Sequence, residues 1–176
     1  MLSAAFRLLG RSRHTAIASL AAIAIGVLGN SAALASVAEL FDSVRKNDLG
    51  SVQRLLGRGF DVDSTDEKGL SLLMEASRSG HLAMVDYLVK SKAQLNRRNA
   101  TGESAVMLAA FHGHLKVVQL LHKAGAEIHH SGWSPIHYAS FQGHSHVCRY
   151  LIESNVAIDD RAPNGATPLM LASREG

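Results

Sequence analysis

The feature that most constrains this chain is a glycine that recurs about every 33 residues. Gly69, Gly102, Gly132 and Gly165 are separated by 33, 30 and 33 positions. A period of this length is typical of proteins in which each repeat is one supersecondary unit stacked on its neighbours. The sequence therefore predicts a linear array of repeats.

Four units align without gaps from these glycines. They read GLSLLMEASRSGH, GESAVMLAAFHGH, GWSPIHYASFQGH and GATPLMLASREG. Each unit has a hydroxyl residue where a helix N-cap is expected, and two have a proline directly after it. A glycine that favours a left-handed turn ends the first helix in three units. The caps are Ser71, Ser104, Ser134 and Thr167, and the turn glycines are Gly80, Gly113 and Gly143.

A second helix is predicted after each turn. The segments LAMVDYLVK, LKVVQLLHK and SHVCRYLIE have apolar residues at helical spacing. We expect Leu120 to be a core residue of the second segment. Cys148 aligns with Val85 and Val118, which favours a buried structural residue, although a reactive thiol stays open. No internal disulfide is possible, since the chain has one cysteine.

The array is predicted to start before its first aligned glycine. Residues 36–65 are interpreted as a degenerate opening repeat, with helices near 38–46 and 49–58. Asn47 occupies the slot of the turn glycines, and Lys92 that of Gly59 and Gly125. Both residues should adopt the left-handed conformation.

This pattern resembles the ankyrin-repeat family motif G-x-T-P-L-H-x-A-A-x-x-G-H, and the resemblance covers residues 36–176. It implies an all-α solenoid of helix–turn–helix units with hairpin-like connecting loops. The expected divisions are a cap at 36–65, repeats at 66–98, 99–131 and 132–161, and a partial repeat at 162–176. It also implies a protein partner, bound on a concave groove formed by the loops and the first helices.

Carried over from the family, the contact positions flank the repeat glycine and precede the Gly-His pair. They are Lys68, Leu70, Arg78, Ser79, Thr101, Glu103, Phe111, His112, Trp133, Phe141 and Gln142. Aromatic anchors of this kind often dominate binding energy. Phe111 and Phe141 could instead pack against each other and tie adjacent repeats together.

The loop before Trp133 is short. The connecting segments 91–101 and 154–164 have 11 residues each, whereas 124–131 has eight. A shortened loop would open the groove beside Trp133, and simple drift in loop length is the alternative.

The first 35 residues have a different composition. Three arginines precede an apolar stretch at 15–28, and Ala33-Leu34-Ala35 follows. This order is typical of a secretory signal peptide cleaved after Ala35; a retained anchor is the alternative. We expect export to the periplasm or the cell exterior, with a bacterium as the expected source. No stable membrane span is expected after cleavage.

Charge argues against nucleic acid as a partner. All 15 acidic residues follow residue 35, whereas three of the 18 basic residues precede it. The predicted mature chain is therefore formally neutral and offers no basic footprint.

Nine of the ten histidines follow residue 35 and are candidate metal ligands. His81, His114, His144 and His137 belong to the repeat motif, and no Cys or carboxylate stands at ligand spacing from the rest. The adjacent His129 and His130 suggest a pH-sensitive contact instead. No metal, cofactor or catalytic residue is expected, because Ser134 and His137 already have structural roles.

The sequence predicts a non-catalytic protein-binding module, expected to be a monomer. A secreted effector or immunity-type inhibitor is the first alternative. A histidine-based metal-binding protein is a second, less favoured alternative. The fourth repeat stops at Gly176 before a second helix, which should leave Leu169 and Leu171 partly uncovered. A fragment, a truncated reading frame and an open end that docks on a partner all stay open.

Overall fold

A computed structural model describes residues 37–129 and 132–175. Residues 37–45 are helical. They are followed by α2 (Leu49–Gly57), α3 (Leu72–Arg78), α4 (Leu82–Lys90), α5 (Ala105–Phe111), α6 (Leu115–Lys123), α7 (Pro135–Phe141), α8 (Ser145–Glu153) and α9 (Pro168–Glu175). In this part of the chain, one isolated bridge between Thr65 and Ser71 is the only strand-like pairing. The predicted all-α class is confirmed.

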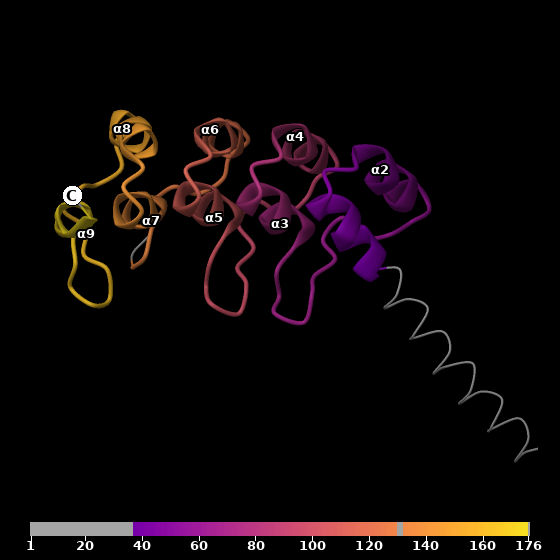
Figure 1. Cartoon of the computed structure of the whole chain (residues 1–176), viewed down its shortest axis with the longest axis horizontal. Helices are drawn as coiled ribbons and strands as arrows, with labels where there is room; N and C mark the ends of the chain where they lie inside the picture. Colours follow the sequence, from indigo (N-terminus) through magenta and orange to yellow (C-terminus); the bar gives the residue numbers. More distant parts are fainter. Residues whose placement is uncertain (1–36, 130–131, 176) are drawn as a thin grey trace, which may run out of the picture. The chain divides into compact units, whose positions relative to one another are not determined.

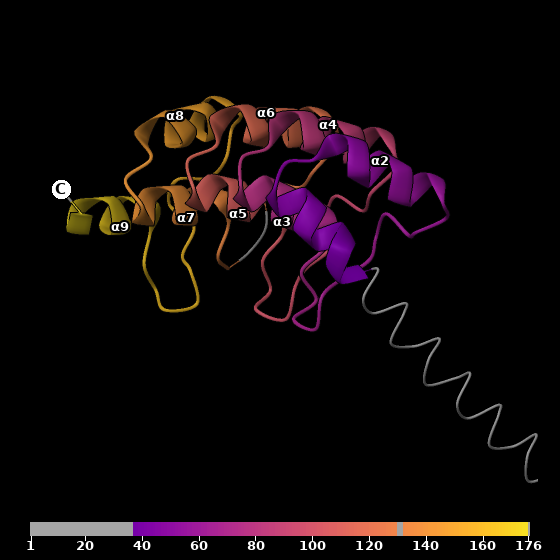
Figure 2. The ribbon, with the colours of Figure 1, turned by 45° about the vertical axis from the view of Figure 1, so that its right-hand side comes forward.

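The helices of residues 40–176 lie in two layers (Figure 1). One layer contains α3, α5, α7 and α9, and the other contains α2, α4, α6 and α8. Each of α3, α5 and α7 packs on the helix that follows it and on the next helix of its own layer. Figure 2 shows the connecting loops projecting from the α3–α9 layer. This arrangement is the predicted solenoid of helix–turn–helix units.

The core repeats from unit to unit. Ala76, Ala109 and Ala139 are fully buried where neighbouring first helices meet. In the second helices the buried positions include Leu88, Leu121 and Leu151. The expectation that Leu120 is a core residue is wrong. Leu120 is half-buried, because one residue along a helix rotates a side chain by about 100°.

The left-handed turns fall where the sequence places them. Asn47 and Lys92 have φ of 57° and 69°, and Asn155 adopts the same conformation in the third repeat. Gly80, Gly113 and Gly143 have φ between 69° and 73°. These values confirm the left-handed turns expected at the aligned positions.

A ladder of histidines connects successive repeats. The Nε2–H of His81 donates to the carbonyl oxygen of Arg45 at 3.2 Å. In the same way His114 binds the carbonyl of Arg78 at 3.0 Å, and His144 that of Phe111 at 2.9 Å. Each bond fixes the end of a first helix in the preceding repeat. The histidine of each Gly-His pair therefore positions the last residues of the first helix in the repeat before it.

The last described repeat is partly uncovered. Leu169 is 77% exposed, whereas its counterparts Leu73, Val106 and Ile136 are at most 1% exposed. Leu171 is buried, so the expectation that it would be uncovered is wrong. Cys148 was expected to be a core residue, but it is half-buried. It lies on the side of α8 that faces the exposed Leu169.

The signal peptide predicted at 1–35 lies outside the described residues. Within the part of the chain that is described, no helix is both long and apolar enough to cross a membrane.

Candidate protein-binding surface

Aromatic side chains from two repeats meet at the carboxyl end of α5 and along α7. The ring of Phe111 lies edge-on to those of His112 and Tyr138, with centroids 5.1 and 5.9 Å away. Trp133, in the loop before α7, lies 5.6 Å from Tyr138. We call Phe111, His112, Trp133 and Tyr138 the aromatic strip. Such edge-on contacts hold rings in defined orientations.

The side chains of the aromatic strip are partly exposed to solvent, and ring contacts hold them in place. His112 is exposed, and the other three side chains are half-buried. Trp133 also packs on the buried His137, 5.9 Å between ring centroids. A half-buried aromatic surface made from rigid elements can bury more area against a partner at little cost in side-chain entropy.

Sequence reasoning missed Tyr138. The contact positions carried over from the family lie beside the glycines, whereas Tyr138 lies within α7. Its counterparts in the preceding repeats are Glu75 and Leu108, both buried. The signal that could have revealed it is a bulky aromatic at a position that otherwise holds core residues.

The strip has a distinct electrostatic environment. The partial burial of the His112 ring lowers its pKa, electrostatic interactions with His114, Arg78 and His144 lower the pKa further, and the interaction with Glu103 raises it. Burial and the nearby Glu103 raise the pKa of Tyr138, and Arg98 opposes this. Neutral His112 and a protonated Tyr138 are therefore favoured at neutral pH.

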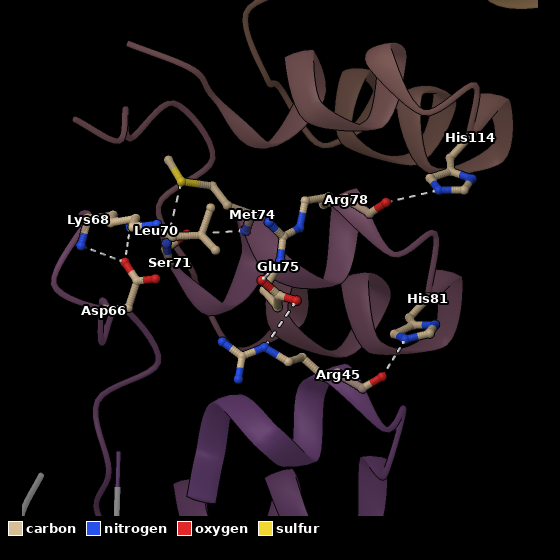
Figure 3. A network of polar contacts seen from close by, with 10 residues as sticks. All are labelled: Arg45, Asp66, Lys68, Leu70, Ser71, Met74, Glu75, Arg78, His81 and His114. Carbon is tan, nitrogen blue, oxygen red and sulfur yellow. Dashed lines mark hydrogen bonds and ion pairs between the residues drawn. The ribbon is translucent and has the colours of Figure 1, made fainter. Parts of the chain in front are cut away.

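A buried carboxylate lies between two arginines at the α3 end of the same face (Figure 3). Glu75 is 2% exposed and pairs with Nη2 of Arg78 at 2.6 Å and with Nε of Arg45 at 3.5 Å. Arg45 comes from the helical segment 37–45 and Arg78 from the last turn of α3. A buried carboxylate requires such partners, because an unpaired charge in the interior is costly.

The remaining predicted contact residues differ in their exposure to solvent. Lys68, Ser79, Thr101 and Gln142 are exposed, and Glu103 and Phe141 are half-buried. Glu103 accepts hydrogen bonds from the side chains of Asn99 and Thr101. Leu70 was predicted to contact a partner, but it is a core residue with 8% exposure, so its side chain is not available.

Loop geometry explains the burial of Leu70. The carboxylate oxygen Oδ1 of Asp66 accepts the main-chain N–H groups of Lys68 and Leu70, each at 2.9 Å. The main-chain N–H of Asp66 donates to the carbonyl oxygen of Leu70. This closed turn directs the chain into the cap of α3 and leaves Lys68 at its tip.

Three further histidines outside the strip, His122, His137 and His146, have structural partners, whereas His129 is exposed. The main-chain N–H of Ser134 donates to Nδ1 of His137, and Nε2–H of His137 donates to the carbonyl of Asp160 at 3.0 Å. His122 bonds the hydroxyl of Tyr150, and His146 bonds the carbonyl of Gly113. Among the described residues, no group of three or more side chains is arranged to hold a metal ion. His130 lies outside them.

A pocket lies away from the aromatic strip. It has a volume of about 740 Å³ between α7, α8 and α9, and its lining includes Ile152, Ile158 and Leu169. In the preceding repeats, the counterparts of Ile158 and Leu169 are Ile128 and Ile136, which the next unit covers. The pocket is therefore part of the face on which repeats stack.

Comparison with known proteins agrees with this architecture. A family model described as ankyrin repeats (3 copies) matches residues 40–131 and 126–176. The chain belongs to the ankyrin-repeat family. It is also 33% identical over 131 residues to mouse protein phosphatase 1 regulatory subunit 27, covering 72% of this chain. The chain spans 64% of the length of that relative.

Membership of this family has a functional consequence. Ankyrin repeats indicate a protein–protein interaction module, since their stacked units present an extended surface for another chain.

Proposed function

We propose that this protein is a non-catalytic binding module that holds a protein partner on the face formed by its first helices and loops. The observation that carries the proposal is the aromatic strip. Aromatic side chains are enriched among the residues that dominate binding energy, and they act best when adjacent groups hold them in place. The ring contacts of Phe111, Tyr138 and Trp133 provide that support.

The polar groups that resemble a catalytic site support the same proposal. Ser134 and His137 are 2.8 Å apart, but they are 3% and 0% exposed. Both nitrogens of the His137 ring already have partners. A substrate could not reach this pair without unfolding the start of α7, so we assign it to the packing of the repeat.

A role in regulating another protein is consistent with the relative found in the mouse. The name of that protein describes a regulatory subunit of a phosphatase. For this chain we propose only the general class, in which one protein acts on another by binding it.

Export is part of the proposal and rests on the composition of residues 1–35. We propose that the protein acts in the periplasm or outside the cell, as a monomer that begins near Ser36. N-terminal sequencing of the native protein tests this. An intact chain starting at Met1 and recovered from the cytosol would contradict it.

The binding proposal is tested by capture from the native envelope fraction with matched baits. The wild-type chain and Lys116→Ala, a change on the exposed side of α6, should retain the same partner. Trp133→Ala should retain much less of it. Equal recovery by all three baits would show that the aromatic strip is not the binding surface.

A further inference from the structure

The face that carries the aromatic strip also carries an excess of positive charge at one place. Arg45 and Arg78 share the single carboxylate of Glu75. We call these two residues the guanidinium pair. One buried negative charge between two positive groups leaves a net positive charge, and the pair is held in position from beneath (Figure 3).

Both guanidinium groups have N–H donors that the ion pairs with Glu75 do not use. The side chain of Arg45 is 51% exposed and that of Arg78 is 43% exposed. A guanidinium has five N–H donors, and the ion pairs to Glu75 engage Nε of Arg45 and Nη2 of Arg78. Within the described residues, neither arginine has a second carboxylate partner. The exposed donors can therefore receive an anion from another molecule.

The main chain beneath the pair is fixed as well. The carbonyl of Arg45 accepts from His81, and the carbonyl of Arg78 accepts from His114. The guanidinium of Arg45 also lies 6.0 Å from the centre of the Phe41 ring. Arginine fixed in this way loses little conformational entropy when it binds a planar anion.

The guanidinium pair is continuous with the aromatic strip. His114, which donates to the carbonyl of Arg78, stacks its ring on that of His112, with centroids 6.1 Å apart. From His112 the ring contacts run through Phe111 and Tyr138 to Trp133. One partner segment can thus reach both parts of the surface.

We propose that the guanidinium pair is a carboxylate-binding subsite, and that the partner segment has an Asp or Glu side chain there and an apolar side chain on the aromatic strip. This inference rests on the proposed binding function. A carboxylate fits because its two oxygens match the paired N–H groups of a guanidinium. Among the described ion pairs, neither Glu103 nor Asp66 is paired with Arg45 or Arg78.

The test starts from random 12-residue peptides displayed on phage and selected on the full chain. Selected peptides should contain Asp or Glu beside apolar residues more often than the unselected library does. A selected peptide is then synthesised with its acidic residue unchanged, replaced by the neutral amide, or replaced by phosphoserine. Peptide changes leave the protein intact, so a loss of binding cannot be due to unfolding.

We expect the acid-to-amide change to weaken binding about tenfold, the size expected for hydrogen bonds to a charged group. The triple variant Arg45→Gln/Glu75→Gln/Arg78→Gln removes the buried charge together with its two partners, so no unpaired carboxylate is left in the interior. It should weaken binding of the acidic peptide by a similar factor and leave the amide peptide unaffected. Arg54→Gln, on the exposed side of α2, is the matched control and should change neither. Added salt should weaken binding of the acidic peptide alone.

The possible failures can be told apart. If no peptide is selected, or if binding survives Trp133→Ala, the proposed function fails. If peptides bind through Trp133 but the amide form binds as well as the acid, the carboxylate subsite is wrong while the binding function stands. Binding of only the phosphoserine form also overturns the inference.

Discussion

The imidazole of His114 packs so closely on Gly80 that a β-carbon at residue 80 would lie 2.7 Å from the ring. His114 is held there by its bond to the carbonyl of Arg78. Gly113 and His144 repeat the relationship one unit later, at 2.8 Å. The Gly-His pair thus links repeats in both directions: the glycine admits the next histidine, and the histidine fixes the preceding helix end.

Gly80→Ala should destabilise the array for two reasons. Residue 80 has φ of +73°, which costs an L-residue about 1–2 kcal/mol, and the new methyl group would collide with His114. Gly143 has φ of +69° but no atom within 4 Å, so Gly143→Ala is the matched control. Denaturant unfolding should show a loss at least about 1 kcal/mol larger for Gly80→Ala. Equal losses would mean that the contact with His114 does not constrain residue 80.

The second helices test the corrected core. Leu121 is completely buried, so Leu121→Ala should lower the free energy of unfolding by about 2–5 kcal/mol. Leu120 is half-buried, and Leu120→Ala should cost about 1 kcal/mol. Calorimetric or denaturant melts of the two variants give the comparison. A larger loss from Leu120→Ala would show that α6 turns Leu120, and not Leu121, toward the core.

His112 should make stability depend on pH. Its pKa is lowered from 6.5 in the folded protein, so the unfolded chain binds the proton first as the pH falls. The folded state is therefore destabilised once the pH drops below 6.5, and this penalty is absent at higher pH. Between about pH 7.5 and about pH 5.5, wild type should lose more stability than His112→Gln, which lacks this imidazole. An identical loss in both proteins would contradict the assigned environment of His112.

The fold could be predicted from the sequence because local rules repeat in it. Positive φ at Lys92 followed from its alignment with glycines, and the N-caps followed from hydroxyl residues at fixed offsets. Leu120 was misplaced because periodicity alone does not distinguish adjacent positions at the edge of an apolar face. Leu70 was misplaced because its burial depends on the turn that Asp66 closes.

The surface was harder to predict, because it depends on contacts between repeats. Phe111, His112 and Trp133 were identified through the family pattern, and the structure adds Tyr138, whose ring lies between those of Phe111 and Trp133. Glu75 looks like an ordinary surface acid in the sequence. Its burial depends on Arg78 of the same helix and on Arg45, which approaches from the preceding unit.

The central claim is that the aromatic strip binds a protein partner, and the affinity of the captured partner for Trp133→Ala tests it most directly. Titration calorimetry should show a loss of about 2 kcal/mol or more, while Lys116→Ala binds as wild type does. Circular dichroism melts of both variants establish that the array remains folded. If Trp133→Ala unfolds the array, or if the folded variant binds with unchanged affinity, then Trp133 has only a structural role and the claim is wrong.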